Sequence, residues 1–331
     1  MGKMRKKYKR TVIAAITAGM LLFSGCKVGN KDIVVSGTLN SKQVFQIGDT
    51  TCGVKEAKVY LVNYQNIYGT AYGLDLWAHD FGEESLEDYV KDITLEELVQ
   101  VVCMNQLAKA HEMELSEEEK ASMAEAAKEY YATLTEDERD YMGVSESDIC
   151  EYYEHYALAQ KLYSSLTSEV NEEVSDDEAR VMEVMQIFVS DATKASEVEQ
   201  KLEAGEDFAS VANNYNELSS IQMYISRDSV PDEVEEAAFA LDNNEVSGKI
   251  KAENGYYFIR CLNKYHVEYT EANKENIVEK REEAAFDDVY DAFVSSLDSN
   301  INSTLWDELN LDTESEIKTD SFFTIFEKYF N

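Results

Sequence analysis

The stretch ENGYYFIRCLNK, residues 253–264, decides the interpretation of the fold. Asn-Gly beside apolar residues is a strong short-range signal for a hairpin turn. The aromatic and β-branched residues that follow favour a strand that starts at this turn. Further upstream, EVMQIFV at 183–189 has the same character and is predicted to be another strand. The residues between these strands therefore belong to one small domain.

Helical spacing fills much of the segment between the two strands. Apolar residues recur at i, i+3, i+4 and i+7 in two places, which is the pattern of a helix with one buried face. The two sets are Phe208, Val211, Ala212 and Tyr215, and Val234, Ala237, Ala238 and Leu241. From Glu183 to Lys264 we predict the order strand, helix, helix, short strand, helix and strand pair.

The amino-acid sequence of this segment resembles that of a parvulin-type peptidyl-prolyl isomerase domain. GEDFASVA at 205–212, EEAAFAL at 235–241, EVSGKI at 245–250 and NGYYFI at 254–259 match consecutive landmarks of that family in order. The resemblance implies a compact domain of a small antiparallel sheet with helices. Around it, YGTAYGLDLW at 68–77 and capped helices resemble the flanking regions of Gram-positive extracytoplasmic foldase lipoproteins.

The polar residues that the family uses do not carry over. Parvulins resemble one another in supplying two histidines and an aspartate or cysteine. By position, the histidines fall on Gln186 and Tyr257, and the aspartate or cysteine falls near Ile221, in a shortened loop. The catalytic set is therefore degenerate. Gln186 and Tyr257 could hydrogen-bond to each other and preserve the strand pairing, or they could still polarise a bound prolyl amide.

The apolar slot that the resemblance implies is kept in a shallower form. The family's Met-Phe-Phe positions read Val230, Val234 and Phe239. Rotation about an X-Pro bond faces a barrier of about 18–20 kcal/mol. Its catalysis requires a proline slot and polar groups that stabilise the twisted amide, without nucleophile, metal or cofactor. We therefore expect no cofactor and no metal here, and a domain that binds extended or prolyl peptides with weak or no isomerase activity.

Helices are predicted on both sides of this domain. Leu95, Leu98, Val99, Val102 and Cys103 lie on one face of a helix. Thr94 with Glu97 has the spacing of a capping box ahead of that helix. Further capping boxes pair Ser116 with Glu119 and Thr135 with Glu138, which predicts a series of antiparallel helices with short connections.

Aromatic residues are frequent in these helices. A helix predicted at about 147–170 carries tyrosines along one side, and a long helix is predicted again after His266. A tyrosine stripe at helical spacing indicates core packing, although the 21 tyrosines of the chain leave room for a client-binding surface. The terminal DSFFTIFEKYF, residues 320–330, is too apolar to stay in water and is predicted to dock.

The N-terminus is predicted to be a processed export signal. A basic segment precedes TVIAAITAGMLLF at 11–23, which is too short for an ordinary membrane span but has the length of a signal-peptide core. It runs into FSGC, which resembles the lipobox of bacterial lipoproteins and predicts lipidation of Cys26. An uncleaved N-terminal anchor is the alternative. Either interpretation places the rest of the chain outside the cytoplasmic membrane, anchored to its outer face.

Charge and cysteine spacing exclude several classes of protein. The 331 residues carry a formal charge of −36 at pH 7, which repels phosphate backbones and argues against nucleic-acid binding. Cys52, Cys103, Cys150 and Cys261 are far apart and form no CxxC pair, which argues against a zinc or redox motif. Two disulfides are possible in an exported protein, but the apolar surroundings of Cys103 and Cys150 favour buried thiols.

The whole pattern predicts an α+β protein. We expect a signal peptide at 1–25, a lipid-anchored tether at 26–43, a helical chaperone-like region at 44–174, a parvulin-like domain at 175–267, and a C-terminal helical region at 268–331. Both ends of the chain are predicted to form one all-helical domain, with the parvulin-like domain inserted in it or flanked by it.

The predicted function is that of a membrane-anchored foldase or chaperone whose partners are unfolded or newly exported proteins. The alternatives are an active prolyl isomerase and a solute-binding lipoprotein. Solute binders usually have two α/β lobes with parallel strands, which this pattern does not indicate. A hydrolase is disfavoured because neither a nucleophile elbow nor metal-ligand spacing is visible. The oligomeric state stays open.

Overall fold

A computed structural model describes residues 27–28, 31–32, 34–35, 39–71, 74–77, 85–311 and 317–330. The predicted signal peptide, Cys26 and part of the tether lie outside these residues. No helix in the described ranges is long and apolar enough to span a bilayer. The chain divides into two compact units, one within residues 1–169 and 283–331 and the other within residues 170–282.

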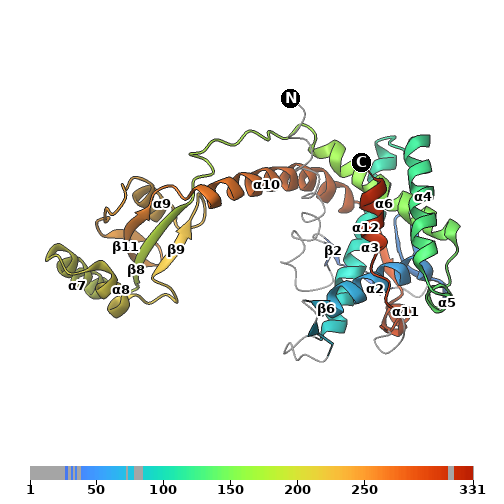
Figure 1. The fold of residues 1–331 in the computed structure, drawn as a ribbon, viewed down its shortest axis with the longest axis horizontal. Helices are drawn as coiled ribbons and strands as arrows, with labels where there is room; N and C mark the ends of the chain where they lie inside the picture. The colour runs from blue at the N-terminus through green and yellow to red at the C-terminus, as the bar shows by residue number, and fades with distance from the viewer. Residues whose placement is uncertain are drawn as a thin grey trace. The chain divides into compact units, whose positions relative to one another are not determined.

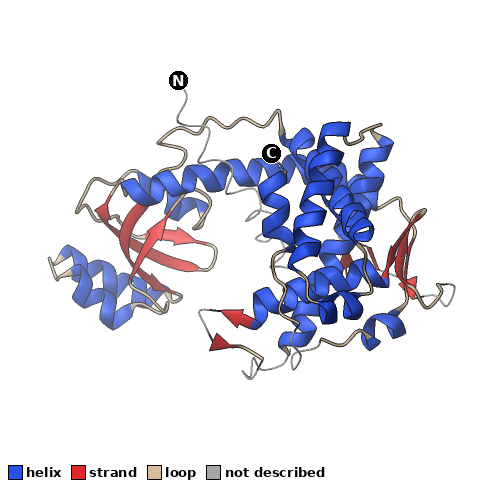
Figure 2. Ribbon diagram, turned by 45° about the vertical axis from the view of Figure 1, so that its right-hand side comes forward, coloured by secondary structure: helices blue, strands red, loops and turns tan. Residues whose placement is uncertain are grey.

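The unit built from both ends of the chain, here called the helical unit, consists mostly of helices (Figure 1). Its helices are α2 (Val54–Gly69), α3 (Leu86–Ala110), α4 (Glu117–Thr133), α5 (Glu136–Met142), α6 (Glu146–Thr167), the C-terminal part of α10 (Val267–Val294), α11 (Ser303–Glu308) and α12 (Phe322–Tyr329). One hydrophobic core unites them. The unit also contains strands (Figure 2), so the prediction that it is all-helical is wrong in this respect.

The strands of the helical unit form short sheets. The larger one has the order β3-β12-β4-β5, and β6 pairs with β7 in a separate ribbon. The bounds are β3 (Val34–Val35), β4 (Gln43–Ile47), β5 (Thr50–Gly53), β6 (Thr70–Ala71), β7 (Leu74–Asp75) and β12 (Ser299–Ile301); β1 (Lys27–Val28) pairs only with β2 (Lys31–Asp32). Because β12 pairs with both β3 and β4, this sheet joins the two ends of the chain.

Two of the three predicted capping boxes begin helices. Ser116 and Glu119 exchange side-chain and backbone hydrogen bonds at the start of α4, and Thr135 and Glu138 do so at α5. The box predicted at Thr94 is wrong. Thr94 lies inside α3, where its hydroxyl donates to the Val90 carbonyl at 2.6 Å. The helix begins two turns earlier.

The tyrosine stripe of α6 lies in the core. Tyr152, Tyr153, Tyr156 and Tyr163 are all less than 9% exposed, so this stripe offers no open client-binding surface. The prediction that these residues are core is confirmed. Burial of aromatic rings is a large part of what stabilises a helical core.

The apolar C-terminus docks, as predicted. Phe322 is fully buried, its N–H donates to Asn63 Oδ1 at 3.0 Å, and its carbonyl accepts from the Tyr153 hydroxyl at 2.8 Å. At the other end of α12, Lys328 and Tyr329 both reach the Glu129 carboxylate. These contacts fix α12 against α4 and α6.

The second unit, here called the parvulin unit, contains a four-stranded antiparallel sheet with the order β10-β11-β8-β9. Its elements are β8 (Met182–Val189), α7 (Ala192–Glu203), α8 (Phe208–Tyr215), β9 (Gln222–Ile225), α9 (Asp232–Phe239), β10 (Ile250–Ala252) and β11 (Gly255–Asn263), followed by the first part of α10. This is the order predicted from the sequence.

Helices cover both faces of that sheet. Figure 1 shows α9 on one side and α7 with α8 on the other. Because side chains alternate along a strand, β8 sends Met182 and Val184 into the cluster under α9, and Ile187 and Val189 into the cluster under α7 and α8. The mixed architecture confirms the predicted α+β fold class.

Gly255 closes the β10–β11 hairpin. It has φ of +152°, and a Cβ atom there would lie 2.7 Å from the Val189 carbonyl oxygen. Only glycine fits a backbone that approaches so closely in this conformation. The Asn-Gly signal in the sequence therefore marks a turn that the tertiary packing also requires.

The cysteines of the described residues are thiols, and no disulfide joins any two of them. Cys52, Cys103 and Cys261 are buried, whereas Cys150 is half-buried. Burial raises the pKa of the Cys52 and Cys261 thiols. A raised pKa lowers the thiolate fraction of these groups. Of the two cysteines predicted to be buried thiols, Cys103 is buried and Cys150 is only half-buried.

Candidate functional site

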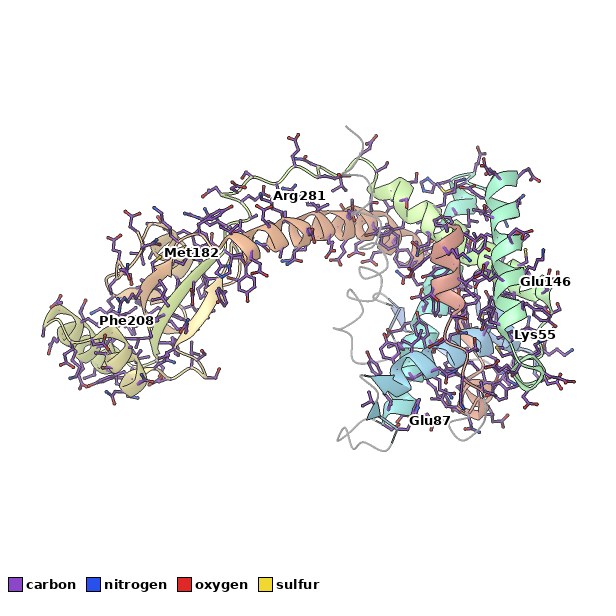
Figure 3. All side chains as sticks on the ribbon, viewed as in Figure 1. Lys55, Glu87, Glu146, Met182, Phe208 and Arg281 are labelled. Atoms are coloured by element: carbon purple, nitrogen blue, oxygen red, sulfur yellow. The ribbon has the colours of Figure 1, made fainter. Side chains whose placement is uncertain are left out.

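The face of the parvulin sheet beneath α9 brings together most of the residues that the resemblance singles out. Val234, Phe239 and Tyr257 belong to one buried cluster, and Val230 packs against it. Gln186 lies two residues from Val184 on β8 and opposite Ile259 on β11, so its side chain lies on the same face. Figure 3 labels Met182 on β8, in this cluster, and Phe208 on α8, in the opposite one.

Gln186 is buried and already hydrogen-bonded. Its side-chain Nε2 donates to the Ser220 carbonyl at 3.1 Å, and its backbone N–H donates to the Ile221 carbonyl at 2.8 Å. A buried amide must find such partners because an unpaired polar group in the interior is costly. Gln186 thus ties β8 to the loop that precedes β9.

Tyr257 is bonded to a different partner. Its hydroxyl accepts from Asn254 Nδ2 at 2.9 Å, and its ring packs on Phe188 with centroids 4.8 Å apart. In the strand register Tyr257 lies opposite Phe188, while Gln186 lies opposite Ile259. The suggested hydrogen bond between Gln186 and Tyr257 is therefore wrong, because each side chain is held by its own loop.

The apolar slot is closed in this structure. Val234 is 1% exposed and Phe239 is 8% exposed. The guanidinium of Arg180 lies 4.7 Å from the centroid of the Phe239 ring, and that of Arg227 lies 4.2 Å from it. Such contacts are attractive because the ring face carries negative partial charge. A proline ring would have to displace them to reach Phe239.

Carboxylates hold these two arginines in place. Asp177 lies 3.4 Å from Arg180 and 3.2 Å from Arg227, and Glu235 lies 3.1 Å from Arg227. Arg180 also donates to the Phe239 carbonyl at 3.4 Å. The two arginines with Asp177, Glu235 and Phe239 are called the arginine clamp below. Sequence reasoning missed it because Arg180 is far from Phe239 in the chain.

Ile221 is not brought to this face. Its side chain packs with Tyr215 and Phe208 in the cluster under α7 and α8. Only its backbone takes part, through the hydrogen bond with Gln186. We therefore correct its assignment: the neighbouring Ser220, whose carbonyl accepts from Gln186, is the loop residue that contacts the candidate site.

The polar groups at the two family positions are neutral, while the charged groups beside them, Arg180 and Arg227, lie over the Phe239 ring. Gln186 and Tyr257 could bond to an amide only after exchanging their present partners. Among the described residues no group of His, Cys, Asp or Glu has the arrangement of a metal site. The polar groups that could stabilise a twisted amide are thus engaged in internal hydrogen bonds.

Comparison with known proteins finds similar sequences for this unit and for much of the chain. The family model for the PPIC-type PPIase domain matches residues 144–274, which start before the parvulin unit and end in α10. "Foldase protein PrsA" of Caldanaerobacter subterraneus subsp. tengcongensis is 26% identical over 251 residues, covering 67% of this chain and 76% of the relative. The chain is therefore similar to PrsA foldases along two thirds of its length, and it matches a parvulin-type domain.

Other PrsA proteins show a similar extent of likeness. "Foldase protein PrsA" of Bacillus subtilis (strain 168) is 26% identical over 268 residues, with 76% of this chain and 75% of the relative covered. The crystal structure of the peptidylprolyl isomerase PrsA from Bacillus cereus aligns with 80% of this chain and 99% of its own at 21% identity, with a TM-score of 0.39. Through its parvulin domain the chain resembles a prolyl isomerase.

Proposed function

We propose that this PrsA-like chain is a membrane-anchored foldase or holdase for exported proteins. Its parvulin domain binds extended or prolyl peptide segments and has little or no isomerase activity. The clients are unfolded or newly exported polypeptides, and the protein acts at the outer face of the cell membrane. The observation that carries the proposed loss of isomerase activity is the closed candidate site, where both polar positions are occupied by internal hydrogen bonds.

Loss of isomerase activity follows from where the polar groups are bonded. A catalyst of this reaction must offer its polar groups to the amide as it twists. Gln186 instead donates to Ser220, and Tyr257 accepts from Asn254. The arginine clamp covers Phe239 as well. Opening the site would cost the energy of all these contacts before any substrate is bound.

The foldase role is supported by the resemblance and by the charge. Relatives along much of the chain are named foldases. The formal charge of −36 steers basic, unfolded clients towards the protein. Two units on one chain also allow a client to be held at two weak sites, which raises its effective concentration at the second.

The membrane anchor rests on the sequence alone. FSGC ends the signal-peptide core, and lipidation of Cys26 would hold the chain at the membrane. Replacing Cys26 by Ala should move the protein from the membrane fraction to the soluble fraction of cells. Persistence of Cys26→Ala in the membrane fraction would favour the alternative of an uncleaved anchor.

The isomerase question is tested by exchange NMR on a panel of X-Pro peptides. We expect peptide signals to shift on addition of the protein, without faster cis–trans exchange. The matched variant is Phe239→Ala, which alters the slot and leaves Gln186 and Tyr257 in place. Faster exchange that disappears in Phe239→Ala would show that the site is active and would overturn this part of the proposal.

The foldase question needs a separate assay. A denatured secreted enzyme is diluted from urea with and without the protein, and light scattering reports its aggregation. We expect aggregation to be suppressed at stoichiometric protein and to return in high salt, because screening weakens steering of basic segments. Unchanged aggregation at every ratio would contradict the foldase proposal.

A further inference from the structure

Three aromatic rings of the parvulin unit lie together, two of them exposed to solvent and the third partly buried. They are Tyr224, His266 and Tyr269, here called the aromatic trio. His266 stacks on Tyr269 with centroids 4.4 Å apart and planes at 17°, and Tyr224 meets the Tyr269 ring edge-on at 4.5 Å. Tyr224 is 44% exposed and Tyr269 is 43% exposed. Rings of this size are usually covered in a soluble domain, so an open cluster indicates a binding surface.

The trio is fixed in position by the backbone beneath it. The His266 N–H donates to the Val181 carbonyl at 2.8 Å, and the His266 carbonyl accepts from the Thr270 N–H at 2.9 Å. The buried Thr270 hydroxyl in turn accepts from the Val181 N–H at 3.0 Å. These bonds hold the start of α10 against β8. The rings are therefore arranged before any ligand arrives, which lowers the entropic cost of binding.

Tyr224 also lies on the open edge of the sheet. Among the described strands, the order places β9 at the edge of the sheet, paired with β8. The Gln186 N–H donates to the Ile221 carbonyl, and two residues further along Met223 lies opposite Val184. Ile221 and Met223 therefore turn their backbone N–H and C=O groups towards β8. By alternation, Gln222 and Tyr224 turn theirs outward.

Only one of those two outward residues is capped. The Ser220 hydroxyl donates to the Gln222 carbonyl at 2.6 Å and accepts from the Gln222 N–H at 3.3 Å. The N–H and C=O of Tyr224 make no hydrogen bond within the described part of the chain. An edge with such groups is a template for another strand. The open backbone and the open rings thus meet at one residue.

The charge next to the trio is negative. Glu183 lies directly opposite Tyr224 in the register and on the same face of the sheet. Glu268 and Glu271 follow on the first turns of α10, and Lys274, which could offset them, is paired with Asp176 and Glu271. A cation over a tyrosine ring and near a carboxylate is attracted by both.

We propose that the aromatic trio and the open edge of β9 bind an extended, basic segment of an unfolded polypeptide. The segment adds as a strand beside β9 and exchanges hydrogen bonds with Tyr224. An Arg or Lys side chain opposite Tyr224 lies across the rings of the trio towards Glu183. An added strand lies two strand spacings, roughly 10 Å, from β8, a distance that an extended Arg or Lys side chain and the Glu183 side chain span together.

This site rests on the proposed function that the chain binds unfolded polypeptides, and it is separate from the candidate site under α9. Met223 and Ile225 of β9 point into the cluster beneath α9. Tyr224, between them, therefore points to the opposite face. A client held at the trio leaves Gln186 and Tyr257 untouched.

The test uses the full chain and a fluorescein-labelled peptide of alternating lysine or arginine and valine, without proline, measured by fluorescence anisotropy at low salt. We expect Tyr269→Ala and Tyr224→Thr each to weaken binding about tenfold, through loss of ring contact with the cation. Glu183→Gln should weaken it about threefold to tenfold. Leu218→Ala, which removes an exposed apolar side chain elsewhere in the unit, is the matched control and should bind as the unaltered protein does.

Strand addition is tested on the peptide, so that the fold of the protein is not at risk. N-methylation of alternate residues blocks one edge of the peptide and leaves the other intact. One of the two methylated peptides should lose binding and the other should keep it. Hydrogen exchange of residues 221–226 should slow when the unmethylated peptide is added, because Tyr224 N–H becomes bonded.

Several results would overturn the proposal. Equal binding by the trio variants, equal binding of a peptide with glutamate in place of the basic residues, or equal binding of both methylated peptides would each do so. If the chain still suppresses aggregation of a denatured client, the trio proposal alone fails. If the chain also fails to suppress aggregation of the denatured client, the proposed foldase function fails too.

Discussion

Two pairs of stacked rings in this protein have nearly the same geometry and different surroundings. In the helical unit Tyr153 and Phe322 stack with centroids 4.3 Å apart and planes at 16°. In the parvulin unit His266 and Tyr269 stack at 4.4 Å and 17°. The first pair is fully buried, whereas Tyr269 is 43% exposed. Stacking geometry therefore does not distinguish a structural aromatic cluster from an available one; the surrounding atoms do.

The difference arises from what covers each pair. Tyr130 and Phe326 enclose the Tyr153–Phe322 pair. The Phe322 N–H donates to Asn63 and the Phe322 carbonyl accepts from Tyr153, which fixes the backbone of α12 around the pair. At the aromatic trio, the neighbours are an edge strand and the first turn of a helix. A cluster that lies between several helices serves stability. A cluster at a strand edge has its outer side open for a partner.

Phe322→Ala should have the largest effect on stability. Removing a fully buried phenylalanine costs the transfer free energy and leaves a cavity, so we expect the free energy of unfolding to fall by about 3–5 kcal/mol. Urea unfolding followed by far-UV circular dichroism measures it. A loss below about 1 kcal/mol would mean that α12 is not held in the core, and the comparison above would no longer hold.

Glu97→Gln should have the next largest effect, and the effect should depend on pH. Glu97 is buried on α3, and its Oε2 has no hydrogen-bond partner in the described part of the chain. Burial is the main cause of the raised pKa of the nearby Tyr60 and Tyr64, and the charge of Glu97 adds to it. Burial raises the pKa of Glu97 to about 7 from an ordinary 4.5. Folding therefore favours the protonated form, and the wild type loses stability as pH rises from about 4.5 to 7.

Glutamine keeps the shape of Glu97 and removes this titration. The stability of Glu97→Gln relative to wild type should rise by roughly 3 kcal/mol between pH 4.5 and pH 8. Urea unfolding of both proteins at the two pH values measures the change. Parallel pH dependence in the two proteins would show that the Glu97 carboxyl is ionised at little cost, and that the tyrosine cluster around it is open to water.

The arginine clamp is an intermediate case, because Phe239 is covered by side chains that are themselves partly exposed. Replacing both Arg180 and Arg227 by Ala should lower the free energy of unfolding by about 1–2 kcal/mol, since each cation–ring contact contributes about 0.5–1 kcal/mol. Chemical denaturation measures the loss. In the double Arg→Lys variant, which keeps the charges, the loss should be smaller. Unchanged stability in the alanine variant would show that the contacts of the two arginines with the Phe239 ring do not stabilise the fold.

Tyr269→Ala should have the smallest effect on stability. Tyr269 is 43% exposed, and its ring contacts are with Tyr224 and His266 outside the buried clusters, so we expect a change within about 0.5 kcal/mol. Thermal unfolding beside the unaltered protein measures this change. A loss comparable with that of Phe322→Ala would mean that the trio is structural, and would remove the reason to treat it as a binding surface.

The sequence by itself determined the features that depend on neighbouring residues. The hairpin at 253–264, the order of elements in the parvulin unit and the capping boxes at Ser116 and Thr135 all follow from local patterns. Hydrophobic period and turn chemistry act over a few residues, so they can be read from a single stretch. The resemblance to parvulins depends on the same local patterns.

Tertiary structure decided which of those patterns were used. Thr94 and Glu97 have the spacing of a capping box, but α3 extends back to Ser85, whose side chain caps it. Packing of the longer helix outweighs one local capping signal, because a cap contributes only about 1 kcal/mol. Glu97 then enters the core.

The candidate site depended on tertiary structure most of all. Strand register and residues far away in the chain decide three features of this site. They are the hydrogen-bond partner of Gln186, the face on which Ile221 packs and the side chains that cover Phe239. The aromatic trio likewise joins Tyr224 on β9 to His266 and Tyr269 at α10. Contacts over such separations arise only when the sheet and helices have assembled, so no local pattern in the sequence encodes them.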